Sequence, residues 1–357
     1  MAIMERHMFS GANTPTGFFS YFDHIIPAQT AYHIYCIKGG PGVGKSTFMK
    51  KIAGDMTARG KIVEYIHCSS DPGSLDGIVL PQSGIALIDG TAPHIIDPKY
   101  PGAVDEIINL GQFWDDRAIM KHRDSIISCF SEISAQFSRA YSYLAAAGNI
   151  RADIVKTRMR GVDERKLDDI SNDIIGAEFS NTTAASMRPG LRKMFATAIT
   201  PDGLVGHIDT LISGCGKVYV LQGESGCGSE IILDDIARQA LKCGLYAEAF
   251  YCPMDPDGKI EHLLVPELGL AVCTSNTYHA VAPVGTDMIE LGTADCVKIQ
   301  NEKNIFNLLL DNALNELGKA KGLHDELEEN YVPNMNFNAV EEYRQATVEK
   351  ILAAISD

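Results

Sequence analysis

The sequence lacks the features expected of a membrane-spanning, secreted or nucleic-acid-binding chain. It has no apolar run of about 18 residues, the length that crosses a bilayer. Its first residues, M-A-I-M-E-R-H, lack the apolar core of a signal peptide. The formal net charge is −15, which argues against broad binding to DNA or RNA because a phosphate backbone requires a basic surface. We therefore expect a cytoplasmic protein that spans no membrane.

Disulfide and zinc-binding patterns are also missing. None of the nine cysteines forms a C-x-x-C pair, and several lie within apparent strands. We expect them to be buried, reduced thiols. The 357 residues are 45% hydrophobic and 22% charged, which is enough for two domains with cores of their own.

One glycine-rich stretch carries a specific chemistry. Residues 37–47 read I-K-G-G-P-G-V-G-K-S-T, which matches the Walker A pattern G-x-x-x-x-G-K-[ST]. An apolar strand pattern precedes it and an apolar helical face follows. In this pattern backbone amides surround phosphate oxygens at a helix N-terminus, Lys45 contacts the β- and γ-phosphates, and Ser46 binds Mg²⁺. The predicted nucleotide-binding residues are Gly39, Gly40, Pro41, Gly42, Val43, Gly44, Lys45, Ser46 and Thr47.

Three further polar residues are candidates for catalysis. Asp89 ends the apolar strand I-A-L-I-D, which is typical of a Walker B aspartate that holds Mg²⁺. Asp71 lies in the turn-rich segment C-S-S-D-P-G-S-L-D-G, together with Asp76, and is a candidate to face the γ-phosphate or an acceptor; the alternative is a purely structural turn. His94 is a candidate to orient water or to bind a substrate phosphate, and the alternative is a structural histidine.

The chain also repeats itself. Residues 6–26 align without a gap on residues 192–212, and nine of the 21 positions are identical, among them Arg6 with Arg192 and Phe9 with Phe195. The alignment continues through the glycine loop and then pairs Asp71 with Asp255, Asp89 with Thr274 and His94 with His279. We therefore predict two α/β domains of the P-loop NTPase type in tandem, residues 1–186 and 187–357, packed as a pseudo-dimer.

The two halves differ chemically at the loop. Ser229 stands where the first half has Lys45, and Glu230 stands where it has Ser46. A carboxylate at this position repels a triphosphate, and the lysine that would contact the phosphates is gone. We expect a degenerate second nucleotide site that is retained as a scaffold.

Each half is predicted to be a mainly parallel sheet flanked by helices, with a helical extension at its C-terminal end. Apolar residues at spacings of three and four predict helices over residues 114–147, 149–175, 304–329 and 340–355.

The chain resembles a largely uncharacterised bacterial family of tandem P-loop, ATPase-like proteins. The segments that carry the resemblance are G-G-P-G-V-G-K-S-T, H-C-S-S-D-P-G-S-L-D-G, A-L-I-D-G-T-A-P-H and D-P-K-Y-P-G-A-V-D-E-I. The resemblance covers essentially the whole chain and implies a P-loop NTPase fold and ATP binding, but no particular substrate.

Three functions are compatible with these residues. The first is a Mg²⁺-dependent ATPase with one competent site in the first half; it is expected to be slow because Gly90, and not a water-orienting glutamate, follows Asp89. ATP is favoured over GTP because the sequence has no N-K-x-D motif. The second is a small-molecule or nucleotide kinase in which Asp71 or Asp76 positions an acceptor hydroxyl. The third is an interaction module in which ATP shifts a contact between the halves or with an unknown partner.

Overall fold

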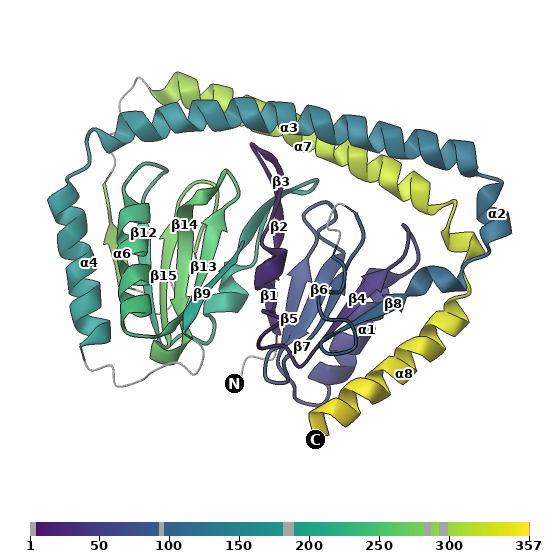
Figure 1. The fold of residues 1–357 in the computed structure, drawn as a ribbon. Coiled ribbons are helices and arrows are strands. Elements are labelled where there is room, and N and C mark those ends of the chain that lie inside the picture. Colours follow the sequence, from purple (N-terminus) through teal and green to yellow (C-terminus); the bar gives the residue numbers. More distant parts are fainter. Residues whose placement is uncertain (1–4, 93–95, 181–188, 282–286, 293–298, 357) are drawn as a thin grey trace.

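The computed structural model describes residues 5–92, 96–180, 189–281, 287–292 and 299–356. It is an α/β protein with two six-stranded sheets side by side, and two long helices run across the same end of both sheets (Figure 1). No helix in these described ranges combines the length and the apolar character needed to cross a membrane.

The first sheet has the order β1-β5-β6-β7-β4-β8. Its strands are β1 (Glu5–Phe9), β4 (His33–Lys38), β5 (Val63–His67), β6 (Leu75–Leu80), β7 (Ile85–Asp89) and β8 (Asp105–Asn109). All neighbouring pairs are parallel except those of β6, which is antiparallel to both of its neighbours. The segment that the sequence presented as a polar turn therefore continues into a buried strand.

The second sheet repeats this arrangement, with the order β9-β13-β14-β15-β12-β16 when it is read from the equivalent edge. Its strands are β9 (Gly190–Met194), β12 (Lys217–Gln222), β13 (Tyr246–Cys252), β14 (Asp255–Val265), β15 (Leu270–Ser275) and β16 (Asp287–Glu290). Here β14 is the antiparallel strand. The two halves that repeat in sequence thus also have the same sheet topology.

Equivalent hairpins and short elements complete the two halves. The hairpins are β2 (Gly11–Thr14) with β3 (Gly17–Ser20), and β10 (Thr197–Thr200) with β11 (Gly203–Gly206). The short helices are η1 (Phe22–His24), η2 (Leu110–Phe113), α2 (Asp116–Met120), α5 (Ile208–Ile212), η3 (Pro266–Leu268) and η5 (Val332–Asn334). The helices that follow the two glycine loops are α1 (Lys45–Thr57) and α6 (Ser229–Lys242).

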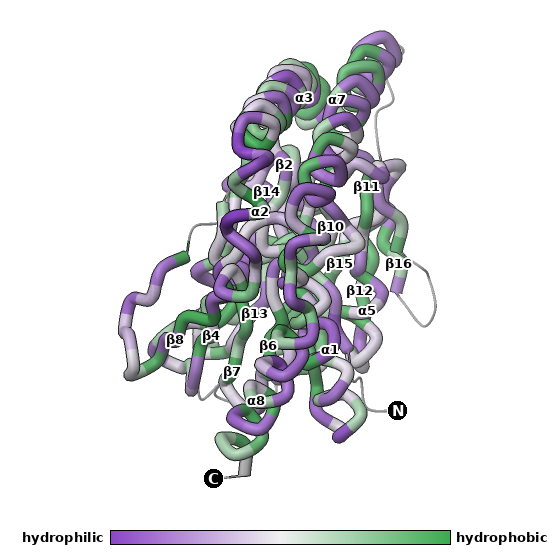
Figure 2. The backbone as a smooth tube through the Cα atoms, turned by 90° about the vertical axis from the view of Figure 1, so that its right-hand side faces the viewer, coloured by the Kyte–Doolittle hydropathy of each residue, from purple (hydrophilic) through white to green (hydrophobic). Residues whose placement is uncertain are grey.

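Two long helices join the halves. α3 (Arg123–Met159) and α7 (Gln300–Glu328) pack antiparallel, and polar and apolar residues alternate along both of them in Figure 2. The prediction of separate helices over residues 114–147 and 149–175 is wrong, because α3 continues through Gly148 to Met159. A Cβ at Gly148 would lie 2.9 Å from the ring of Pro15, so this glycine allows the β2–β3 hairpin to approach the helix.

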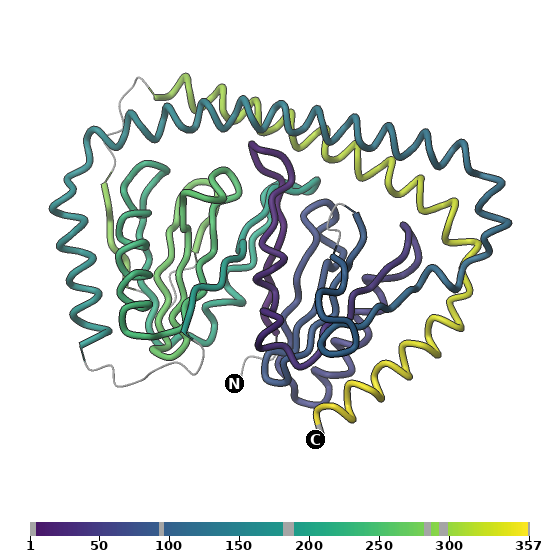
Figure 3. Tube along the Cα trace, viewed as in Figure 1, coloured from purple at the N-terminus to yellow at the C-terminus, as the bar shows by residue number. Residues whose placement is uncertain are grey.

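The helices that follow α3 and α7 are exchanged between the halves. The chain crosses along α3 and continues as α4 (Glu164–Phe179), and it returns along α7 and continues as α8 (Phe337–Ser356) (Figure 3). α4 buries Leu167 and Ile174 in the core of the second half, whereas α8 buries Val348 and Ile351 in the core of the first half. A cut at the repeat boundary, residues 186 and 187, would separate each of these helices from the sheet it covers. That boundary lies outside the described residues.

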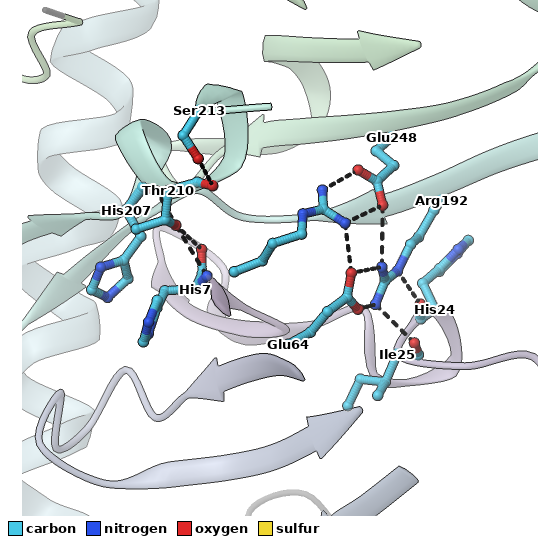
Figure 4. Close-up of polar contacts among 10 residues, drawn as sticks. His7, His24, Ile25, Glu64, Arg192, His207, Thr210, Ser213 and Glu248 are labelled. Atoms are coloured by element: carbon cyan, nitrogen blue, oxygen red, sulfur yellow. Dashed lines mark hydrogen bonds and ion pairs between the residues drawn. The ribbon is translucent and has the colours of Figure 1, made fainter. Parts of the chain in front are cut away.

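Four buried charges hold the two sheets together (Figure 4). Arg6 of β1 pairs with Glu64 of β5 and with Glu248 of β13. Arg192 of β9 pairs with the same two carboxylates, at 2.8 Å and 3.2 Å. Glu64 and Glu248 are only 1% and 3% exposed. Burial alone would raise the pKa of Glu248, but the two guanidiniums outweigh it and hold that pKa below its usual range.

The backbone makes a matching contact beside this network. Phe9 and Phe195, which are equivalent positions of the repeat, each donate an amide hydrogen bond of 2.9 Å to the carbonyl of the other. Both of these residues and both arginines recur in the sequence repeat, so the interface between the halves is built from duplicated residues.

We predict that Arg192→Met lowers the free energy of unfolding by about 3–5 kcal/mol, because it leaves two buried carboxylates with a single guanidinium. Urea denaturation measures this loss. Lys99→Ala is the matched control: it removes an exposed ion pair with Asp23 and should cost about 0–1 kcal/mol. Equal, small losses in both variants would contradict a central role for the network.

Candidate functional site

The first glycine loop, Gly39–Gly44, connects β4 to α1. Gly42 and Gly44 have φ values of 68° and 86°, in the left-handed region that glycine adopts without strain. Val43 turns inward and packs in the core of the first half. The backbone therefore curls so that α1 begins at Lys45 with its N-terminal amides directed toward the loop, as at other anion-binding helix starts. Thr47, in the first turn of α1, is exposed.

Lys45 and Asp89 meet beside this loop. The parallel pairing of β4 with β7 places Asp89 next to Ile37 at the carboxyl end of the sheet. The Lys45 Nζ atom lies 3.6 Å from Asp89 Oδ2 and also donates to the carbonyls of Gly39 and Gly40, at 3.1 Å and 3.0 Å. Asp89 accepts hydrogen bonds from the amide and hydroxyl of Thr91. The sequence placed these groups in one site, and the structure brings them together.

A third charged group, Asp76, joins them through a β-bulge. Ile66 pairs with Gly77 but His67 pairs with Leu75, so Asp76 is the extra residue of β6. The β6–β7 ladder then brings Asp76 alongside Asp89. Asp76 is 3% exposed. Burial, and next the charge of Asp89, raise its pKa to about 7. Bulges often redirect side chains at functional sites.

The remaining predicted residues form other hydrogen bonds or lie outside the described residues. The Ser46 hydroxyl accepts a hydrogen bond of 3.0 Å from the Leu75 amide. Asp71 is held in a turn, where its carboxylate accepts from the Ser74 hydroxyl at 2.8 Å; Lys321 of α7 lies 3.9 Å away. His94 lies outside the described residues.

The connection between α7 and α8, residues 328–337, covers the first loop. A Cβ added to Gly40 would lie 3.2 Å from the Tyr331 ring, and one on Gly44 would lie 3.4 Å from the Phe337 ring. The Glu328 carboxylate accepts a hydrogen bond of 3.2 Å from the Gly42 amide. A carboxylate from the far end of the chain thus occupies one of the loop's amide donors. This contact could not be predicted from the sequence, because a side chain that accepts a hydrogen bond from a backbone amide leaves no pattern of residue types.

The second loop, Gly223–Gly228, is covered in an equivalent way by the end of α3 and the start of α4. A Cβ at Gly228 would meet the Leu167 side chain at 2.3 Å. Arg158 donates to the Ser225 carbonyl at 2.9 Å and lies 3.9 Å from the Glu224 carboxylate. An arginine, Arg158, therefore lies on the second loop, which has no equivalent of Lys45. A glutamate, Glu328, lies on the first loop, which Lys45 follows.

Comparisons of the chain with protein-family models, with curated proteins and with solved structures found no match. The site consists of a glycine loop with an amide that binds a carboxylate, a lysine, and two adjacent carboxyl groups.

We predict that Glu328→Ala raises the affinity of the first loop for an anion such as inorganic triphosphate by about two- to tenfold, because the anion then need not displace a carboxylate from the Gly42 amide. Isothermal titration measures the change.

Glu326→Ala is the control, since it removes the same charge from an exposed position of the same helix. An equal gain in both variants would mean that net charge, and not the contact with Gly42, limits binding.

Proposed function

We propose that the first half binds Mg²⁺-ATP at residues 39–47 and hydrolyses it slowly. The observation that carries this proposal is that the Gly42 amide already holds a carboxylate beside Lys45 and Asp89. A loop that binds one anion through its backbone, next to a lysine, is suited to a polyphosphate.

Each residue has a role in this proposal. Lys45, which now lies against the carbonyls of Gly39 and Gly40, turns toward the β- and γ-phosphates. Ser46 and Asp89 hold Mg²⁺, which neutralises the charge that develops during phosphoryl transfer. Asp76, beside Asp89, adds negative charge near the ion. Gly90 provides no side chain to orient a water molecule, which agrees with slow turnover.

The second half is proposed to bind no nucleotide. Ser229 and Glu230 replace the residues that would contact phosphate and Mg²⁺. Ser229 is buried, 1% exposed, and the loop is closed by Arg158 and Leu167. This half contributes α7 and α8, which complete the first site and the first core.

Lys45→Ala should abolish the rise in melting temperature that Mg²⁺-ATP produces, because a ligand stabilises only the state that binds it. Thermal unfolding with and without nucleotide is the measurement. Ser229→Ala, at the equivalent position of the second loop, is the matched control and should keep the full rise. Stabilisation that survives in Lys45→Ala would disprove the assignment of the first loop.

The covering segment favours a second candidate, in which ATP gates a contact with a partner. Residues 328–337 lie on the loop, so bound phosphate must shift them, and α8 continues directly from them. We expect Mg²⁺-ATP to change hydrogen exchange most in residues 328–337. Unchanged exchange in this segment at saturating nucleotide would eliminate gating by this route.

A further inference from the structure

We propose that the second half contains a binding site for a divalent transition-metal ion, formed by Glu261, His262 and His279. One donor atom from each of these residues lies within 4.8 Å of the others. Two imidazoles and one carboxylate are a donor set that suits zinc, cobalt and iron in their divalent forms. The site is separate from the first loop, and it does not depend on nucleotide binding there.

A β-bulge brings the first two ligands to one side of β14. Phe250 pairs with His262, but Tyr251 pairs with Ile260, so Glu261 is the extra residue. Without a bulge, adjacent strand residues point to opposite faces of a sheet. The Glu261 Oε1 atom lies 3.9 Å from His279 Nδ1. A tetrahedral ion with bonds of about 2 Å would sit between them after a small contraction.

His262 supplies an independent observation. It is completely buried, 0% exposed, and among the described residues neither of its ring nitrogens has a hydrogen-bond partner. A buried imidazole that forms no hydrogen bond loses its interactions with water and gains none in return, which costs free energy. A metal ion bound at one nitrogen would remove most of this cost.

His279 is oriented as metal-binding histidines usually are. Its Nε2 atom lies 2.9 Å from the Thr274 hydroxyl, which leaves Nδ1 facing Glu261. The Asn276 side chain accepts from the amide of His279 at 3.3 Å, and the Asn276 amide donates to the carbonyl of His279 at 2.8 Å. The second ring nitrogen, Nε2, is thus contacted by the Thr274 hydroxyl and also by the Asn276 side-chain nitrogen at 3.3 Å. Contacts of this kind hold the ring and so set the direction of the first nitrogen.

A small cavity gives access to two of the three ligands. It has a volume of about 60 Å³ and is lined by Glu261 and His279, with Arg151, Arg158 and Lys303 among the other lining residues. A bound ion would keep an open position toward this space for water or a small anion.

Two cations lie close to the cluster. Arg151 is directed to other groups, since it lies 3.9 Å from the Asp255 carboxylate and donates to the Cys252 sulfur. Lys259 is buried near Glu261. Its positive charge opposes every divalent cation alike, so the preference for an ion that binds imidazole strongly comes from the two histidines, because Mg²⁺ and Ca²⁺ require more oxygen ligands.

The site occupies the position of the carboxylate pair in the first half. The bulged residue is Asp76 in β6 and Glu261 in β14, and Asp89 corresponds to Thr274. The second half thus has Thr274 in place of Asp89 and adds His262 beside the bulged carboxylate, whereas His279 is a position at which the sequence repeat also has a histidine, His94.

The test uses the untagged full chain, stripped with a chelator and then titrated with Zn²⁺ or Co²⁺. We expect one equivalent of Zn²⁺ to remain after gel filtration, and Co²⁺ to give the absorption bands of a site with nitrogen and oxygen ligands. These spectra are taken on the wild-type chain, so they do not depend on whether a variant folds. No retained zinc and no Co²⁺ bands would overturn the proposal.

Variants then identify the ligands. His262→Leu and His279→Gln should each remove the bound equivalent, and Thr274→Val should weaken Zn²⁺ binding by about ten- to a hundredfold by releasing the His279 ring. His67→Gln is the control for adventitious binding, because His67 lies in a separate cluster with His7 and His207. Zn²⁺ binding that is lost in His67→Gln but retained in folded His262→Leu would overturn the proposal. Lys45→Ala should leave Zn²⁺ binding intact.

Discussion

The rest of the structure depends on the buried ion network between the sheets. Arg6 and Arg192 each contact both Glu64 and Glu248, so neither half satisfies its own buried carboxylate alone. The same junction carries the reciprocal backbone pair of Phe9 and Phe195. With the sheets fixed there, α3 and α7 can span both halves and deliver α4 and α8 to the opposite cores. The two halves are therefore parts of one folding unit, although the sequence repeats.

Because of this exchange, each glycine loop is covered by a segment from the other half of the sequence. On the first loop the segment supplies Glu328, whose side chain is 39% exposed. On the second loop it supplies Arg158, which is 4% exposed and holds the loop closed. The repeated chain thus has one glycine loop that is contacted by a carboxylate and one that is contacted by an arginine. The bulge behind the second loop keeps a carboxylate, Glu261, and has His262 next to it.

Much of this could be predicted from the sequence. The glycine loop, the strand before it, the strand that ends at Asp89 and the helices near residues 304–329 and 340–355 follow from local patterns, and the repeat implied two like sheets. β6 was missed because Asp76 and Gly77 weaken its strand pattern. The exchange of α4 and α8 was missed because periodicity reveals an apolar face but not which sheet it covers. The bulge at Glu261 depends on the register of two strands, and no local pattern encodes that register.

The central claim is that one of two related loops binds nucleotide. Isothermal titration of Mg²⁺-ATP into the full chain tests it most directly, because the stoichiometry counts sites without assuming which residues form them. The account predicts one site per chain. Two sites would mean that Ser229 and Glu230 do not disable the second loop, and no binding would mean that residues 328–337 keep the first loop closed or that it serves another purpose.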